Sequence, residues 1–157
     1  MYDFKKYLTG RNVLEVGPNK GALFEKYYPL TKKYTLLEPN RHFEKDYIKL
    51  QKRHPNLYYE INNFEAFSAD EKFDTIVMMA VIAHIKKWDS QRICSKIDSL
   101  LNEGGFLIIE TNNTKRNLAV LALCYRNYEK IEAKTSYNVI MKWLKIDYRD
   151  VVVYRKN

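Results

Sequence analysis

The sequence predicts an α/β fold, in which a doubly wound, mostly parallel sheet carries helices on both faces. Short apolar runs alternate with helical patterns five times along the chain, and this order requires crossover connections between parallel strands. Of the 157 residues, 46% are hydrophobic and 29% are charged, as expected of a globular domain. No repeat or Pro/Gly/Ser-rich linker interrupts the sequence, so we expect a single domain over residues 1–157.

Seven segments have the composition of strands. Five are short, largely apolar runs, which are typical of strands buried in a parallel sheet. Two more lie in the C-terminal third of the chain. The predicted strands are 12–16, 34–38, 56–61, 73–80, 106–110, 128–135 and 150–154.

Four segments repeat apolar side chains at helical spacing. Asn40 is a favourable N-cap for the second of them. The glycines of Asn102-Glu-Gly-Gly105 are typical of the residues that follow a helix, so they end the third. The predicted helices are 21–28, 40–53, 89 or 90 to 101, and 114–126.

In a doubly wound sheet a ligand lies beyond the carboxyl ends of the strands, so residues that follow the strands are the candidates for function. Gly17 and Gly21 follow the first strand and permit both a tight turn and close approach of a ligand to the backbone. A strand-to-helix turn also needs glycine for structural reasons. Glu38 ends the second strand, where a carboxylate can accept both hydrogen bonds of a ribose diol or serve as a capping residue.

Six segments together resemble, in order and spacing, the motifs of the class I S-adenosylmethionine-dependent methyltransferases, in particular their Rossmann-like domains of types 11 and 12. The resemblance extends from about residue 12 to residue 156. It implies a seven-stranded sheet with an antiparallel C-terminal strand. The matching segments are 13–21, 36–39, 62–65, 73–77 with 81–85, 100–109 and 148–156.

The resemblance implies that S-adenosyl-L-methionine is the cofactor. Glu15 would lie near the methionine ammonium, Gly17 and Gly21 beneath the methionine and ribose, and Glu38 on the ribose hydroxyls. Asn63 would face the adenine. The cofactor-binding residues expected from the resemblance are Glu15, Gly17, Pro18, Asn19, Gly21, Glu38, Pro39, Asn63, Phe64, Ala80 and Val81.

Two of these residues depart from the family pattern. Asn19 stands where the family has the middle glycine of its loop, and asparagine tolerates the left-handed backbone conformation better than most residues. Asn63 replaces the usual acid at the adenine amino group. Its amide oxygen can still accept that hydrogen bond, without charge.

Methyl transfer from a sulfonium requires an acceptor held in line with the methyl group, so positioning supplies much of the rate. An oxygen or protonated-nitrogen acceptor also needs a base. His84 follows the fourth strand and is the candidate general base, although it is equally compatible with a histidine that packs locally. We expect His42 and His54 on the surface, and a structural role for Asp74 at the start of a strand.

The formal charge of +8 comes from the two ends of the chain, whereas residues 61–110 are mildly acidic. Residues 79–82 read Met-Ala-Val-Ile, unlike the Asn-Pro-Pro-Tyr-type motif of enzymes that methylate nucleic-acid amino groups. We therefore favour a small-molecule or carrier-bound acceptor over nucleic acid. Cys94 and Cys124 have no neighbouring metal ligands, so we expect free thiols, no metal site and, with no membrane-spanning run, a cytoplasmic location.

The chain is short for the family, which predicts how its parts are used. Residues 1–11 form a short N-terminal lid segment, residues 12–110 the cofactor-binding half and residues 111–157 the acceptor-side half. A short lid leaves an open cleft, which suits a large or carrier-bound acceptor, or closure by a second copy or a partner subunit.

Two further hypotheses remain open. Gly17, Asn19 and Ala22 approximate a dinucleotide-binding fingerprint with Glu38 about 20 residues on, which is compatible with an NAD-dependent oxidoreductase. The two asparagine departures are compatible with a non-catalytic module of the same fold that binds a cofactor or a partner chain.

Overall fold

The computed structural model describes residues 3–85, 90–112, 120, 122, 123, 126, 128–136 and 149–157. All seven predicted strands are present, with ends shifted by a few residues. The strands are β1 (Asn12–Val16), β2 (Lys33–Leu37), β3 (Leu57–Glu60), β4 (Phe73–Met79), β5 (Leu101–Asn112), β6 (Tyr128–Ser136) and β7 (Arg149–Lys156).

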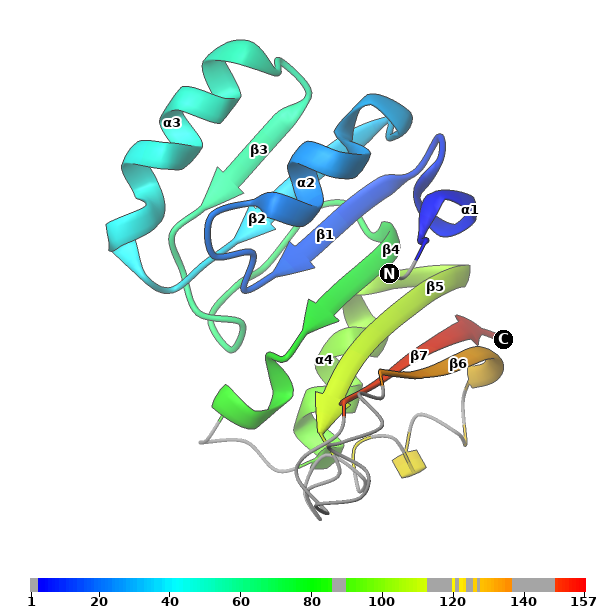
Figure 1. The fold of residues 1–157 in the computed structure, drawn as a ribbon. Coiled ribbons are helices and arrows are strands. Elements are labelled where there is room, and N and C mark those ends of the chain that lie inside the picture. The colour runs from blue at the N-terminus through cyan, green and yellow to red at the C-terminus, as the bar shows by residue number, and fades with distance from the viewer. Residues whose placement is uncertain are drawn as a thin grey trace.

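The strands form one seven-stranded sheet in the order β3-β2-β1-β4-β5-β7-β6 (Figure 1). Neighbouring strands from β3 to β5 are parallel, whereas β7 lies antiparallel between β5 and β6. The predicted α/β class, with a mostly parallel sheet and an antiparallel C-terminal strand, is therefore confirmed.

Helices cover both faces of the sheet, because successive strand residues point to opposite sides. Side chains of the first three α-helices pack on one face, against residues such as Val13 and Leu36. The fourth packs on the other face against residues such as Leu14 and Ile76 (Figure 1). The α-helices are α1 (Lys5–Leu8), α2 (Ala22–Tyr27), α3 (Glu44–Arg53) and α4 (Ser90–Leu100), and the 3-10 turns are η1 (Tyr28–Leu30), η2 (Arg41–Phe43) and η3 (Ile82–His84).

The helix ends follow the predicted chemistry with one exception. The Asn40 side chain accepts a hydrogen bond from the backbone N–H of His42, at 3.0 Å, so it caps the η2 turn that leads into α3. The glycine pair was expected between α4 and the next strand, but it lies inside β5, which already begins at Leu101. A Cβ on Gly105 would lie 2.7 Å from the Asn102 carbonyl oxygen, so the glycine permits an irregularity in the strand.

Residues 3–11 pack against the sheet. Phe4, Tyr7 and Leu8 are buried in the same core as α2 and α3. The Tyr7 hydroxyl donates a 2.7 Å hydrogen bond to Glu132 of β6. Hydrogen bonds from Lys134, Tyr7 and Lys6 lower the pKa of Glu132 to about 2. The N-terminal segment therefore fastens α1 to the C-terminal strands of the sheet.

Asp74 lies at the start of β4 and has the structural role expected of it. Its carboxylate accepts hydrogen bonds from the backbone N–H of Asn12, at 3.0 Å, and from the Asn102 side chain, at 2.9 Å. It therefore joins the starts of three neighbouring strands, at the end of the sheet opposite the carboxyl ends of the strands.

Other expectations concern single residues. His42 is exposed, as predicted, but His54 is half-buried because its ring packs on Phe24 and Tyr28. Cys94 is a partly buried thiol whose Sγ donates to the Val120 carbonyl oxygen at 3.6 Å, whereas Cys124 and most of the predicted helix 114–126 lie outside the described residues. Among the described residues, no helix has the length and apolar character needed to cross a membrane.

Candidate active site

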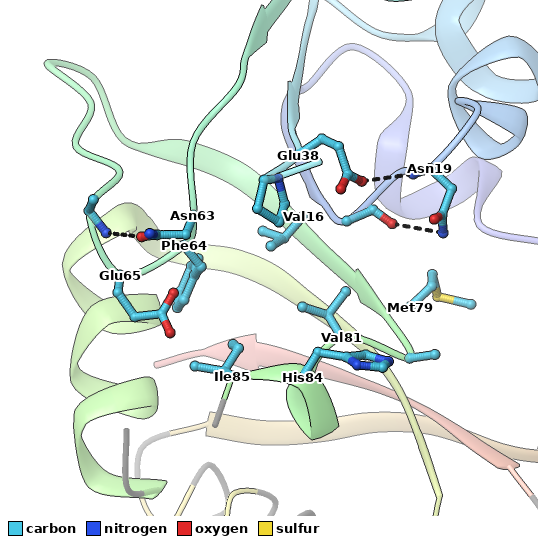
Figure 2. Close-up of a pocket in the computed structure, with 14 residues that line it drawn as sticks. Val16, Asn19, Glu38, Asn63, Phe64, Glu65, Met79, Val81, His84 and Ile85 are labelled. Carbon is cyan, nitrogen blue, oxygen red and sulfur yellow. Dashed lines mark hydrogen bonds between the residues drawn. The ribbon is translucent and has the colours of Figure 1, made fainter. Parts of the chain in front are cut away.

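A cavity of about 840 Å³ opens at the carboxyl ends of the first four strands (Figure 2). From β1 the sheet extends through β2 to β3 on one side and through β4 to β5 on the other. The cavity lies at this switch point, which is the usual ligand position in a doubly wound fold. Its walls come from the segments that follow β1, β2, β3 and β4. The lining residues are Val16, Gly17, Asn19, Glu38, Pro39, Asn63, Phe64, Glu65, Ala66, Met79, Ala80, Val81, His84 and Ile85.

The loop after β1 forms one wall and depends on two left-handed residues. Gly17 has φ 68° and Asn19 has φ 52°, and asparagine tolerates this conformation better than most residues with a side chain. A Cβ on Gly17 would lie 2.7 Å from Cγ2 of Val81, in the segment after the neighbouring strand β4, so the two segments are in close contact. The Tyr47 hydroxyl of α3 donates a hydrogen bond to the Asn19 carbonyl oxygen and holds the loop from behind.

Glu38 connects the loop after β1 to the loop after β2. Its side chain is 5% exposed. One carboxylate oxygen accepts from the backbone N–H of Asn19 at 3.2 Å, and the other from that of Asn40 at 3.0 Å (Figure 2 shows the first bond). Backbone N–H groups thus fix a carboxylate at the cavity wall, and its remaining lone pairs can accept further hydrogen bonds.

The segment after β3 forms a compact turn at the opposite side of the cavity. The Asn63 side-chain oxygen accepts a 2.8 Å hydrogen bond from the backbone N–H of Ala66, and its carbonyl oxygen accepts from the N–H of Phe67. Phe64 is 3% exposed and anchors the turn in the core. Lys96 of α4 donates to the Phe67 carbonyl oxygen, which fastens the turn to the helix beneath.

The segment after β4 forms the floor and part of the rim. Ala80 has φ 58°, an unusual conformation for a residue with a side chain, and its N–H donates to the Glu110 carbonyl oxygen at 3.1 Å. The chain then enters the η3 turn, which places His84 at the cavity with an exposed side chain. Figure 2 shows the His84 ring beside Val81 and Ile85.

Three residues expected at the ligand do not line the cavity, namely Glu15, Pro18 and Gly21. The side chain of Glu15 points to the opposite face of β1 from that of Val16, because strand residues alternate. Glu15 is 4% exposed and accepts a 2.8 Å hydrogen bond from the Tyr34 hydroxyl. Burial raises the pKa of Glu15 to about 7, and the bond from Tyr34 opposes the rise.

Nine of the predicted residues do line the cavity, namely Gly17, Asn19, Glu38, Pro39, Asn63, Phe64, Ala80, Val81 and His84. Five lining residues were missed, namely Val16, Glu65, Ala66, Met79 and Ile85. Val16 and Met79 are the last residues of their strands, so the rule that ligands lie beyond strand ends would have found them. Glu65 and Ile85 lie inside the matching segments 62–65 and 81–85 but received no role there, and Ala66 follows the first of these segments.

Comparisons with known proteins identify a matching family and solved structures with the same fold. No curated protein sequence matches the chain. Residues 4–145 match the family described as methyltransferase domain. Solved structures with the same fold include the N-methyltransferase NodS from Bradyrhizobium japonicum WM9 in complex with S-adenosyl-l-homocysteine, at 19% identity and TM-score 0.76, covering 98% of this chain and 81% of that one.

A second solved structure is the 1,6-didemethyltoxoflavin-N1-methyltransferase from Burkholderia thailandensis with bound 1,6-didemethyltoxoflavin and S-adenosylhomocysteine. It shares 14% identity with a TM-score of 0.76, over 95% of this chain and 72% of that one. A third, the StiE O-MT, shares 13% identity with a TM-score of 0.70, over 94% of this chain and 68% of that one. At identities this low, the structural likeness establishes a common fold and no more.

Proposed function

The chain belongs to the methyltransferase domain family, whose class I members use S-adenosylmethionine, and we propose that it transfers a methyl group from this cofactor to a small-molecule or carrier-bound acceptor. The observation that carries the proposal is the cavity itself. Its walls combine a glycine loop, a buried acid at the end of β2 and a histidine after β4, in the order along the chain that the family motifs have.

The residues present fit the cofactor. Gly17 lines the cavity without a side chain, so a ligand can approach the loop backbone there, and the missing Cβ also lets Val81 pack closely against that backbone. Glu38 is held rigidly enough to accept both hydrogen bonds of a ribose diol. When bound, the cofactor supplies a methyl group on a positively charged sulfur, which an acceptor displaces in line. Pro39 and Phe64 would enclose the adenine with apolar surface.

We assign His84 the role of general base. It lines the cavity, its side chain is exposed to an incoming acceptor, and imidazole accepts protons near neutral pH. Val81 and Met79 supply apolar surface that keeps water from the reacting groups. Most of the rate would then come from the position of the acceptor relative to the methyl group.

A small acceptor is supported by the size of the cavity, about 840 Å³, which lies in the upper range of small-molecule sites. The toxoflavin-precursor methyltransferase holds its small-molecule substrate together with S-adenosylhomocysteine. All residues that line the cavity of this chain fall between positions 16 and 85. We propose that these residues hold the cofactor, and that the predicted acceptor-side half, residues 111–157, contributes acceptor specificity.

The proposal is tested by isothermal titration calorimetry with S-adenosylhomocysteine and by methyl transfer from labelled S-adenosylmethionine to a panel of amine and hydroxyl acceptors. Glu38→Ala is expected to weaken ligand binding at least tenfold, since it removes two charge-assisted hydrogen bonds of about 1.5 kcal/mol or more each. Glu25→Ala, an exposed acid of α2, serves as the control and should bind normally. His84→Gln should lower turnover while leaving ligand affinity unchanged.

Other outcomes would select the other hypotheses. Binding of NAD without binding of S-adenosylhomocysteine would favour an oxidoreductase. Binding of S-adenosylhomocysteine with no transfer to any acceptor would favour a non-catalytic module. Nucleic acid would become the leading acceptor only if it is methylated and if its binding weakens steeply with salt, as phosphate contacts require.

A further inference from the structure

Two carboxylates face the cavity, and they differ in their partners. Both oxygens of Glu38 accept hydrogen bonds from backbone N–H groups. Glu65 also lines the cavity and is half-buried, yet within the described part of the chain its carboxylate has no hydrogen-bond or ion-pair partner. Figure 2 shows Glu65 on the same side of the cavity as Asn63 and Phe64, with the carboxylate turned toward the open space.

The neighbouring candidate for hydrogen bonding to the ligand is already engaged. The side-chain oxygen of Asn63 accepts from the backbone N–H of Ala66 at 2.8 Å, and this bond closes the turn after β3. Asn63 also carries no charge, so a further hydrogen bond to its oxygen would be weaker than one to a carboxylate. Its primary role is therefore to shape the turn that presents the next two residues.

The surroundings of Glu65 favour a hydrogen-bond donor carried on an apolar part of a ligand. Phe64 and Ile85 are both buried and line the cavity with Glu65. A ligand seated against these side chains would remove water from the carboxylate, and a carboxylate that loses water without gaining a hydrogen bond is costly. The ligand must therefore bring a donor to this position.

We propose that Glu65 accepts a hydrogen bond from the exocyclic amino group of the cofactor's adenine, and that it, rather than Asn63, selects adenine over other bases. This inference rests on the proposed function, because it assumes that the cavity holds an adenosine-type cofactor. It assigns adenine recognition to a residue two positions after the one that the family pattern indicates.

The test compares two ligands by isothermal titration calorimetry. One is S-adenosylhomocysteine, and the other is its 6-deamino analogue, in which a hydrogen replaces the amino group. The wild-type chain is expected to bind S-adenosylhomocysteine about 10- to 100-fold more tightly, the range expected for one hydrogen bond to a charged group. In Glu65→Ala this preference should fall to less than about threefold.

Two further variants make the result specific to the carboxylate. Glu65→Gln keeps an oxygen acceptor without the charge, so its preference should lie between those of the wild type and Glu65→Ala. Asp70→Asn removes an exposed charge from the same connecting segment and should keep the full preference. Thermal denaturation establishes that each variant is folded.

The outcomes separate the inference from the function on which it rests. If the wild type binds neither ligand, the proposed function fails. If the wild type prefers S-adenosylhomocysteine and Glu65→Ala keeps that preference, the function stands and the assignment to Glu65 is overturned. Loss of the preference in Asn63→Ala but not in Glu65→Ala or Glu65→Gln would return adenine recognition to Asn63.

Discussion

At the scale of single residues, Glu15 shows how strand geometry can override a motif. The resemblance places this acid near the methionine ammonium, but its side chain lies on the face of β1 turned away from the cavity. It is buried, and its partner is the Tyr34 hydroxyl. A carboxyl in this position joins β1 to the neighbouring strand β2 through Tyr34 and does not line the cavity.

The environment of Glu15 makes folding stability depend on pH. Its pKa is about 7 in the folded chain against an ordinary 4.5, so the stabilisation from the protonated form is complete below pH 4.5 and is lost as pH rises through 7. The loss amounts to about 3 kcal/mol. Glutamine does not titrate, so the free energy of unfolding of Glu15→Gln should rise relative to that of the wild type as pH increases from 4.5 to 8. Urea denaturation of both proteins at pH 5 and pH 8 measures the difference, and equal differences at the two pH values would contradict the raised pKa.

At the scale of elements, the turn between β1 and α2 shapes one wall of the cavity. Gly17 is both left-handed and in close approach to Val81. Gly10 precedes β1 with a similar φ of 70°, but no atom lies within 4 Å of the position its Cβ would occupy. The two glycines thus share a backbone conformation and differ in their surroundings.

This difference provides a matched pair of variants. Gly10→Ala should lose only the conformational cost of the left-handed region, about 1–2 kcal/mol. Gly17→Ala should lose a further 1–3 kcal/mol or so from overpacking against Val81, and should weaken S-adenosylhomocysteine binding at least tenfold. Chemical denaturation and calorimetry give the two quantities. Similar losses of binding in both variants would show that backbone strain, and not the contact with Val81, controls the site.

Element positions were largely predictable because buried strands are short apolar runs and helices repeat every 3.6 residues. The start of β5 was not predictable. Gly104 and Gly105 have the composition of a loop, but the pairing of Leu101 with Phe73 extends the strand across them. Pairing of this kind depends on the neighbouring strand, which local sequence does not specify.

At the scale of the whole molecule, the C-terminal strand joins distant parts of the chain. β7 separates β5 from β6, and Lys156 near its end is almost completely buried. Its ammonium lies 3.0 Å from the Asp98 carboxylate and 2.9 Å from that of Glu103, and it donates to the Leu101 carbonyl oxygen at 3.1 Å. Burial lowers the pKa of Lys156, but these hydrogen bonds outweigh it and raise the pKa overall.

Lys156→Met keeps the apolar stem and removes the charge, so it isolates these polar contacts. We expect a loss of about 1–3 kcal/mol in the free energy of unfolding, because the carbonyl of Leu101 loses its donor and two carboxylates lose their partner. Lys72→Met, at an exposed position, should change stability by less than about 0.5 kcal/mol. S-adenosylhomocysteine binding should be unchanged in both. An unchanged unfolding midpoint in Lys156→Met would mean that water replaces the contacts at no cost.

The sequence by itself determined the α/β class and the seven strands, because hydrophobic periodicity is a local property. Its resemblance to the motifs of the methyltransferase family indicated most of the residues around the cavity. Only the tertiary structure decided the order of the strands, the position of residues 3–11 against β4–β7 and the roles of individual acids. Glu15, Glu38 and Glu65 are chemically alike in sequence, yet Glu15 is buried against Tyr34, Glu38 is fixed by backbone N–H groups, and Glu65 faces the cavity with no hydrogen-bond or ion-pair partner among the described residues. The physical reason is that burial and hydrogen-bond partners come from segments far apart in the chain, which only folding brings together.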